Sequence, residues 1–161
     1  MILVADCSAL IALASCDGLF LSDKLFGTVI VPEAVYHEAV VGDKPEAYLL
    51  KEYLHNKVRK IDPSVSVLLD GFSDRGETEA MLLFKQYSAD KLLIDDKRGR
   101  RMAKINHIKM IGSFGVLLAA KQINLIDGIF PFVTKLLNSD IYVSDALIAT
   151  VMDIAGEKWP R

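Results

Sequence analysis

Short apolar runs alternate with longer amphipathic segments along the whole chain. The runs are rich in Val, Ile and Leu, as buried strands are. They predict strands at residues 2–5, 28–31, 58–61, 91–94 and 109–111. Between them, apolar residues spaced three or four apart predict helices at residues 8–14, 32–41, 45–55, 74–88, 97–106, 113–122, 127–137 and 144–155.

This alternation predicts the fold class. Strands that alternate with helices favour a parallel sheet covered by helices on both faces. Because no repeat, low-complexity segment or long linker divides the sequence, we expect one domain over residues 1–161. The expected architecture is a three-layer α/β/α sandwich with a central, mostly parallel sheet. Ligands bind outside the carboxyl ends of the strands in such sheets, so polar residues directly after strands are the first candidates for a site.

Acidic residues follow two of the predicted strands. Asp6 interrupts two apolar segments in "MILVADCSALIAL", and Asp95 and Asp96 end the run "KLLIDDK". A buried carboxylate is costly unless it is paired, hydrogen-bonded or bound to a metal. Asp6 therefore predicts a neighbourhood that compensates its charge.

Two further acids lie on predicted helices. Glu38 in "VPEAVYHEAV" and Glu79 in "DRGETEAMLLF" border the apolar stripes of their helices. Glu77 looks more like a capping residue, because Asp74 lies three residues before it in a capping-box pattern. Acids drawn into one pocket repel each other, and a divalent cation relieves that repulsion. Carboxylates with water suit Mg²⁺ or Mn²⁺, which can activate a water and stabilise a phosphodiester transition state.

Each acid also has a purely structural explanation. Asp6 and Asp96 can cap the helices that follow them, Asp95 and Glu38 can face solvent, and Glu79 can pair with a nearby base. Their joint placement, two at strand ends and two on apolar helix faces, favours a site.

A basic run follows the paired aspartates. It comprises Lys97, Arg98, Arg100, Arg101 and Lys104. Its position beside the proposed site favours contact with a phosphate backbone, although charge runs are often just solvated helix faces.

Net charge, cysteine content and the length of the apolar runs limit the class of protein. The net charge of −2 gives no general sign of a nucleic-acid partner. Cys7 and Cys16 stand alone without a CxxC motif, which predicts a reduced, cytoplasmic chain without a zinc site. The apolar runs fall short of the roughly 18 residues that a membrane span needs. The apolar segment 127–155 exceeds what a core requires, which predicts a homodimer or partner surface.

Four stretches together resemble the motif blocks of PIN-domain proteins: "VADCSALIAL", "VPEAVYHEAV", "RGETEAMLLF" and "LLIDDKRGRRMA". The similarity is to a PIN-like branch with a GE-x-E helix and paired aspartates, and it covers about residues 1–125. It implies a PIN-like sandwich and a metal-dependent ribonuclease. Many such ribonucleases are toxins of prokaryotic toxin–antitoxin pairs, so RNA and an antitoxin-like protein are the implied partners.

The resemblance also implies site residues. Asp6, Glu38, Glu79 and Asp96 would be the catalytic, metal-holding acids, with Asp95 as a further ligand. Ser8 and Glu77 would support them. The third acid of the family is most often Asp, and Glu77 lies close enough to Glu79 to leave that assignment open.

A second stretch, "VSDALIATVMDIAGE", resembles the third block in isolation. Too few residues follow it for the fourth block, so we interpret Asp145 as a helix cap.

Three functions remain as hypotheses. The first is an Mg²⁺- or Mn²⁺-dependent endoribonuclease, and the second is a binding module for RNA or protein on the same fold without catalysis. The third, a phosphoryl-transfer domain of the receiver or haloacid type, is disfavoured, because "DCS" supplies neither paired acids nor an Asp-x-Asp motif.

Overall fold

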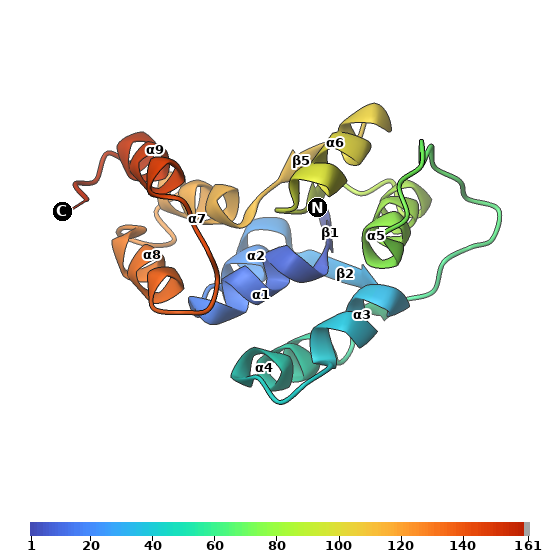
Figure 1. Ribbon diagram of the computed structural model, residues 1–161, viewed down its shortest axis with the longest axis horizontal. Coiled ribbons are helices and arrows are strands. Elements are labelled where there is room, and N and C mark those ends of the chain that lie inside the picture. The colour runs from blue at the N-terminus through green and yellow to red at the C-terminus, as the bar shows by residue number, and fades with distance from the viewer. Residues whose placement is uncertain (160–161) are drawn as a thin grey trace.

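A five-stranded sheet forms the centre of the computed structural model, which describes residues 1–159 (Figure 1). All neighbouring strands run parallel, in the order β3-β2-β1-β4-β5. The strands are β1 (Ile2–Ala5), β2 (Thr28–Pro32), β3 (Val58–Arg59), β4 (Lys91–Leu93) and β5 (Met110–Ile111). Each lies at a predicted position, and the predicted three-layer sandwich is confirmed.

Helices cover both faces of the sheet. Within the described residues they are α1 (Cys7–Ser15), α2 (Leu19–Phe26), α3 (Glu33–Val40), α4 (Pro45–Leu54), α5 (Arg75–Gln86), α6 (Lys97–Ile105), α7 (Ser113–Gln122), α8 (Phe130–Leu137) and α9 (Asp145–Ala155). Helix α5 packs against β1, β2 and β4, whereas α2 packs against β1 and β2 from the other side, with α1 and α7 beside it (Figure 1). Helices α8 and α9 lie at the opposite end of the molecule from α5 (Figure 1).

The helix α2 is absent from the sequence-based prediction. Its sequence, "LFLSDKLF", begins after Gly18, which provides no side-chain cap, and it ends at Gly27. The start signals that revealed the other helices are therefore missing here. Leu21 and Phe26 nevertheless bury it against the sheet layer, so packing rather than capping stabilises it.

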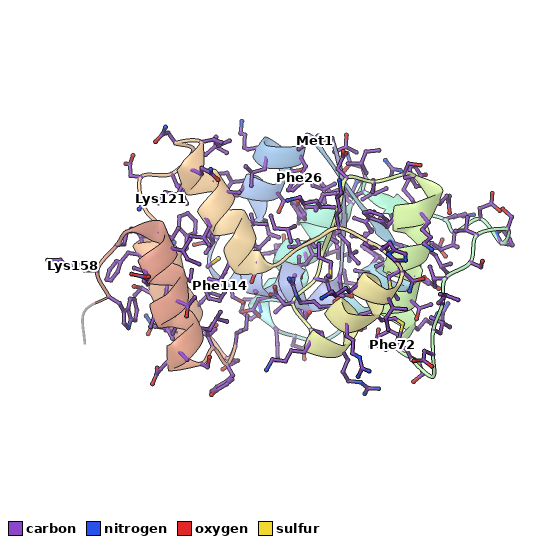
Figure 2. The ribbon with its side chains drawn as sticks, turned by 90° about the horizontal axis from the view of Figure 1, so that it is seen from above. Met1, Phe26, Phe72, Phe114, Lys121 and Lys158 are labelled. Atoms are coloured by element: carbon purple, nitrogen blue, oxygen red, sulfur yellow. The ribbon has the colours of Figure 1, made fainter. Side chains whose placement is uncertain are left out.

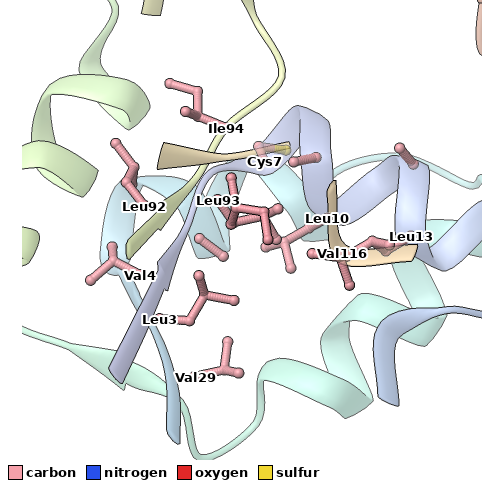
Figure 3. Packing of buried hydrophobic residues seen from close by; sticks show 14 of the residues in the cluster. Leu3, Val4, Cys7, Leu10, Leu13, Val29, Leu92, Leu93, Ile94 and Val116 are labelled. Carbon is pink, nitrogen blue, oxygen red and sulfur yellow. The ribbon is translucent and has the colours of Figure 1, made fainter. Parts of the chain in front are cut away.

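The core sits on both faces of β1 and β4. Leu3 and Leu93 point to the side that carries α1, and Val4 and Leu92 point to the opposite side (Figure 3). All four side chains are fully buried. This explains why both strands read as continuous apolar runs, as strands covered on both faces do.

The topology sets the place of a site. From β1 the chain builds outward to β2 and β3, then returns to the other side of β1 to form β4 and β5. The carboxyl ends of β1 and β4 therefore flank the point where the strand order reverses, where open α/β sheets bind ligands. The Asp6 amide donates to the Leu93 carbonyl across 2.9 Å, which joins the two strand ends directly.

Two smaller findings concern helix ends and length. Ser144, not Asp145, caps α9, because the Ser144 hydroxyl accepts a hydrogen bond from the Leu147 amide at 3.2 Å. Among residues 1–159, none of the helices combines the length and the apolar character needed to cross a membrane.

Candidate functional site

Asp6 lies at the carboxyl end of β1 and is only 3% exposed. It holds the N-cap position of α1, but its side chain makes no capping hydrogen bond, so the purely structural explanation does not account for it. Its Oδ2 accepts a hydrogen bond from the Ser8 hydroxyl at 3.2 Å. Burial raises the pKa of Asp6 to about 6, and the negative charges of Glu38 and Asp74 add to the rise.

Glu77, on the first turn of α5, is 7% exposed. Within residues 1–159 its carboxylate accepts no hydrogen bond, and four other carboxylates act on it: Asp6, Asp74, Asp96 and Glu38. Burial, followed by these like charges, raises its pKa to about 8. Glu77 is thus the most perturbed carboxylate of the group, whereas its sequence pattern indicated a capping role and the resemblance a supporting one.

Glu38 and Asp74 complete the group from α3 and from the start of α5. Partial burial, and then the charge of Asp74, raises the pKa of Glu38. Asp74 caps α5 as the capping-box pattern predicted, since its Oδ1 accepts from the Glu77 amide at 2.8 Å. Sequence reasoning stopped at this capping role, yet the cap position also brings Asp74 beside Glu77 and Asp6.

Two glycines let these carboxylates come together. A Cβ atom at Gly76 would lie 2.8 Å from Glu38 Oε2, and one at Gly99 would lie 2.6 Å from Glu77 Oε2. Both distances are too short for a real contact, so the absence of side chains at these positions leaves room for the carboxylates. We call Asp6, Glu38, Asp74, Glu77 and Asp96 the acidic cluster.

Asp96 has two roles in this arrangement. Its Oδ2 accepts from the Gly99 amide at 2.9 Å, so it caps α6, as the structural explanation proposed. It also contributes to the raised pKa of Glu77. A pocket of about 360 Å³ lies between these residues and is lined by Phe72, Ser73, Asp74, Glu77, Asp96 and Arg98.

Glu79 does not join the acidic cluster. Its Oε2 accepts a hydrogen bond from the amide of Ala34, at the start of α3, at 3.1 Å. Its Oε1 accepts one from Arg75 Nε at 3.2 Å. Residues two positions apart on an α-helix are separated by about 200° around its axis, so Glu77 and Glu79 point to different sides of α5. Of these two acids, Glu77 therefore lies near Asp6 and Asp96, whereas Glu79 contacts the start of α3.

Asp95 likewise turns away from the acidic cluster. Its Oδ1 accepts from the Ser113 amide and its Oδ2 from the Ser113 hydroxyl, both at 2.7 Å. Asp95 thus fixes the end of β4 to the start of α7, and its expected role as a metal ligand stays a prediction.

The basic run divides in a similar way. Lys97, Arg98, Arg101 and Lys104 are exposed, and Arg98 lines the pocket at the acidic cluster. Arg100 is half-buried, and its Nη1 donates to the Ile94 carbonyl at 2.7 Å, so it supports the strand end instead of facing solvent.

A divalent cation fits the donor set of the acidic cluster. Among residues 1–159, no three His, Cys, Asp or Glu side chains converge into a ready group of ligands. Mg²⁺, however, takes one or two carboxylates and keeps several waters. The like charges that raise the pKa values of Asp6 and Glu77, and the space that Gly76 and Gly99 leave, are what a bound cation would use.

Comparison with known proteins agrees with this architecture. The family model described as "DUF3368: PIN domain" matches residues 2–157, nearly the whole chain. A search of curated proteins found no match. PIN domains have a nuclease-type fold, and their nucleases typically use divalent metal ions. With the fold, the strand-end acids and this match in agreement, the chain belongs to the PIN-domain family.

Proposed function

We propose that this protein is an endoribonuclease that hydrolyses RNA phosphodiester bonds and depends on Mg²⁺ or Mn²⁺. The observation that carries the proposal is the acidic cluster at the reversal point of the sheet. Asp6 and Glu77 are buried there among like charges, and burial with those charges raises both pKa values. Two buried carboxylates that form no ion pair within residues 1–159 are a structural cost that a cation-dependent site explains.

The side chains divide the work by position. Asp6 and Glu77 would hold the ion together with waters, and Glu38, Asp74 and Asp96 would lie at its edge. When bound, the ion would lower the pKa of a water and stabilise the charge that develops on the phosphodiester. The Ser8 hydroxyl fixes the Asp6 carboxylate through its hydrogen bond. Arg98, exposed at the same pocket, would bind a phosphate oxygen of the substrate.

The test is cleavage of a mixed single-stranded RNA by the purified protein with Mn²⁺ or Mg²⁺, with and without EDTA. Asp6→Asn removes the charge and keeps the shape of the side chain. Asp153→Asn, at an exposed position of α9, is the matched control. We expect cleavage that needs both the ion and Asp6 and that survives in the control. Cleavage that persists in EDTA, or in the Asp6→Asn variant, would overturn the proposal.

A second candidate function is RNA binding without catalysis. It is favoured by four exposed basic side chains on α6 and by the apolar pocket described below. It predicts that the folded protein binds RNA with no cleavage under any metal condition, and that the Asp6→Asn variant binds equally well.

We further propose a role as the toxin of a toxin–antitoxin pair, with a homodimer or an antitoxin-like protein on the C-terminal surface. That surface carries exposed apolar side chains, including Ile123, Leu125, Leu137 and Ile154. Controlled expression should arrest growth, and Asp6→Asn or coexpression of a small neighbouring reading frame should relieve the arrest. Sedimentation of the purified protein tests the homodimer.

A further inference from the structure

A larger cavity lies beside the acidic cluster. It has a volume of about 460 Å³ and is enclosed by the starts of α1, α6 and α7 and by the segment from α8 to α9. This volume falls within the range of about 300–1,000 Å³ that is usual for small-molecule sites. Figure 2 labels Phe114, which lines the cavity at the start of α7, close to α9.

The walls of this cavity differ from one end to the other. The apolar part is formed mainly by Phe114, Leu136, Ile141, Val143 and Leu147. The polar part is formed by Ser8, Asp95 and Lys97, which offer a hydroxyl, a carboxylate and an ammonium group. Lys97 is exposed and takes part in none of the ion pairs within residues 1–159. Its charge is therefore available to a ligand.

The polar end is continuous with the acidic cluster. Ser8 lines the cavity, and its hydroxyl donates to Asp6 Oδ2 at 3.2 Å. Asp95 and Lys97 also line it, and they are the chain neighbours of Asp96. A ligand that spans both places would need an anionic group beside Lys97 and the acidic cluster, and a mostly apolar group deeper in the cavity.

Tyr142 adds an aromatic surface at the rim. It belongs to the segment between α8 and α9 and is 88% exposed. An aromatic ring this exposed contributes little to the core. Such rings are the platforms on which unpaired bases stack in proteins that bind single strands.

We propose that this cavity is a nucleobase subsite, which seats one unpaired base of single-stranded RNA beside the phosphodiester at the acidic cluster. The proposal rests on the ribonuclease function proposed above. A base matches both ends of the cavity, because its faces are apolar and its edge carries hydrogen-bonding groups. A purely apolar side chain of a protein partner would offer nothing to the ammonium group of Lys97, which takes part in none of the ion pairs within residues 1–159. Because the base must leave its stack, the subsite selects single strands over duplexes.

The test compares binding of two oligomers to the full-length protein. One is a labelled RNA of about 12 nucleotides, and the other is the same sugar–phosphate chain without bases. Both are titrated by fluorescence anisotropy with Mn²⁺ present, in an Asp6→Asn background that stops cleavage. The cavity variant is Tyr142→Ala with Leu147→Ala. The matched control is Tyr48→Ala with Leu49→Ala on α4, since these residues have similar exposure, 70% and 44% against 88% and 45%.

We expect the RNA to bind about tenfold more tightly than the abasic chain, as loss of base stacking usually costs. The cavity variant should lose most of that preference, whereas the control variant should keep it. Because the exchanged residues are exposed, neither variant should fail to fold.

Several results would overturn the subsite. They are equal binding of the two oligomers, an undiminished preference in the cavity variant, an equal loss in both variants, or no binding of either oligomer. Equal binding of the two oligomers would instead favour a protein side chain as the occupant. Cleavage by the parent protein is measured separately, so the subsite can fail while the ribonuclease stands. A base preference without metal-dependent cleavage would support the subsite in a protein that only binds RNA.

Discussion

Two regions of this molecule hold carboxylates in opposite ways. In the acidic cluster, Asp6 and Glu77 are buried next to other carboxylates, and their pKa values are raised. At the helix starts, Glu79 accepts from the Ala34 amide of α3, and Asp95 accepts from both donors of Ser113 on α7. A helix N-terminus supplies N–H donors and partial positive charge, so the second pair of acids is complete within the protein. Only the first pair calls for an external cation.

The two regions are mechanically connected. Glu79 ties α5 to the start of α3, and these helices carry Glu77 and Glu38. Asp95 ties the end of β4 to α7, next to Asp96. The hydrogen-bonded acids therefore hold in place the elements that present the cation-dependent ones. We interpret Glu79 and Asp95 as positioning residues.

The sharpest test of this comparison replaces each of the two acids of α5, Glu77 and Glu79, with Gln in separate variants. Glu77→Gln should lower the metal-dependent cleavage rate about 100-fold or more, because it removes a charge that would hold the ion. Glu79→Gln should lower the rate by about tenfold at most, because the amide oxygen can still accept from the Ala34 amide. Initial rates measured over a range of Mn²⁺ concentrations check both values. Equal losses in the two variants would erase the distinction between the regions.

The next effect concerns the room left for Glu77. Gly99→Ala would bring a Cβ atom to 2.6 Å from Glu77 Oε2 and from Ile94 Cδ1, so both side-chain ends must move. We expect activity to fall about tenfold, as displaced metal-site groups usually cause. The free energy of unfolding should change little, because the cost of moving these side chains is offset by the gain of up to about 1 kcal/mol that Ala gives a helix in place of Gly. A variant with unchanged rate and unchanged Mn²⁺ affinity would show that Glu77 has freedom to shift.

Much of the fold was predictable because its signals are local. Buried strands such as β1 and β4 appear in the sequence as apolar runs, and the spacing of Asp74 to Glu77 predicted the start of α5. The sequence did not predict helix α2, because its N-cap is Gly18 and its stability comes from burial against the rest of the fold.

The site was predictable only in part. That acids follow β1 and β4 is a sequence pattern, so Asp6 and Asp96 stood out. Which acid of α5 faces them depends on the rotation of the helix against the sheet, and the apolar stripe did not separate Glu77 from Glu79. The partner of Asp95 is Ser113, 18 residues away, and no local pattern announces that contact.

A smaller effect lies in the pH dependence of stability without metal. The folded state raises the pKa of Glu77 from its usual value of 4.5 to about 8, through burial and the charges of Asp6, Asp74, Asp96 and Glu38. The folded state therefore binds this proton more tightly than the unfolded state does. The resulting stability is full below about pH 4.5 and is lost as the pH rises toward 8.

Thermal unfolding in EDTA should show this loss as a midpoint that falls by a few degrees between these pH values. The Glu77→Gln variant should have a flatter profile, and Mg²⁺ should stabilise the parent protein most at the alkaline end. A parent profile identical to that of Glu77→Gln would contradict the burial of charge at this position.

The smallest effect separates a positioning carboxylate from a metal ligand. Asp95→Asn keeps an oxygen that can accept from the Ser113 amide, so it should lower the free energy of unfolding by only about 0.5–1 kcal/mol, through the lost charge at the start of α7. Asp95→Ala loses both hydrogen bonds and should cost about 1–2 kcal/mol. Urea unfolding measures these values, and cleavage rates at saturating Mn²⁺ should fall by less than about tenfold in Asp95→Asn. If Asp95→Asn instead lost activity as severely as Glu77→Gln, Asp95 would have to turn from Ser113 toward the cation, and the two regions would be one.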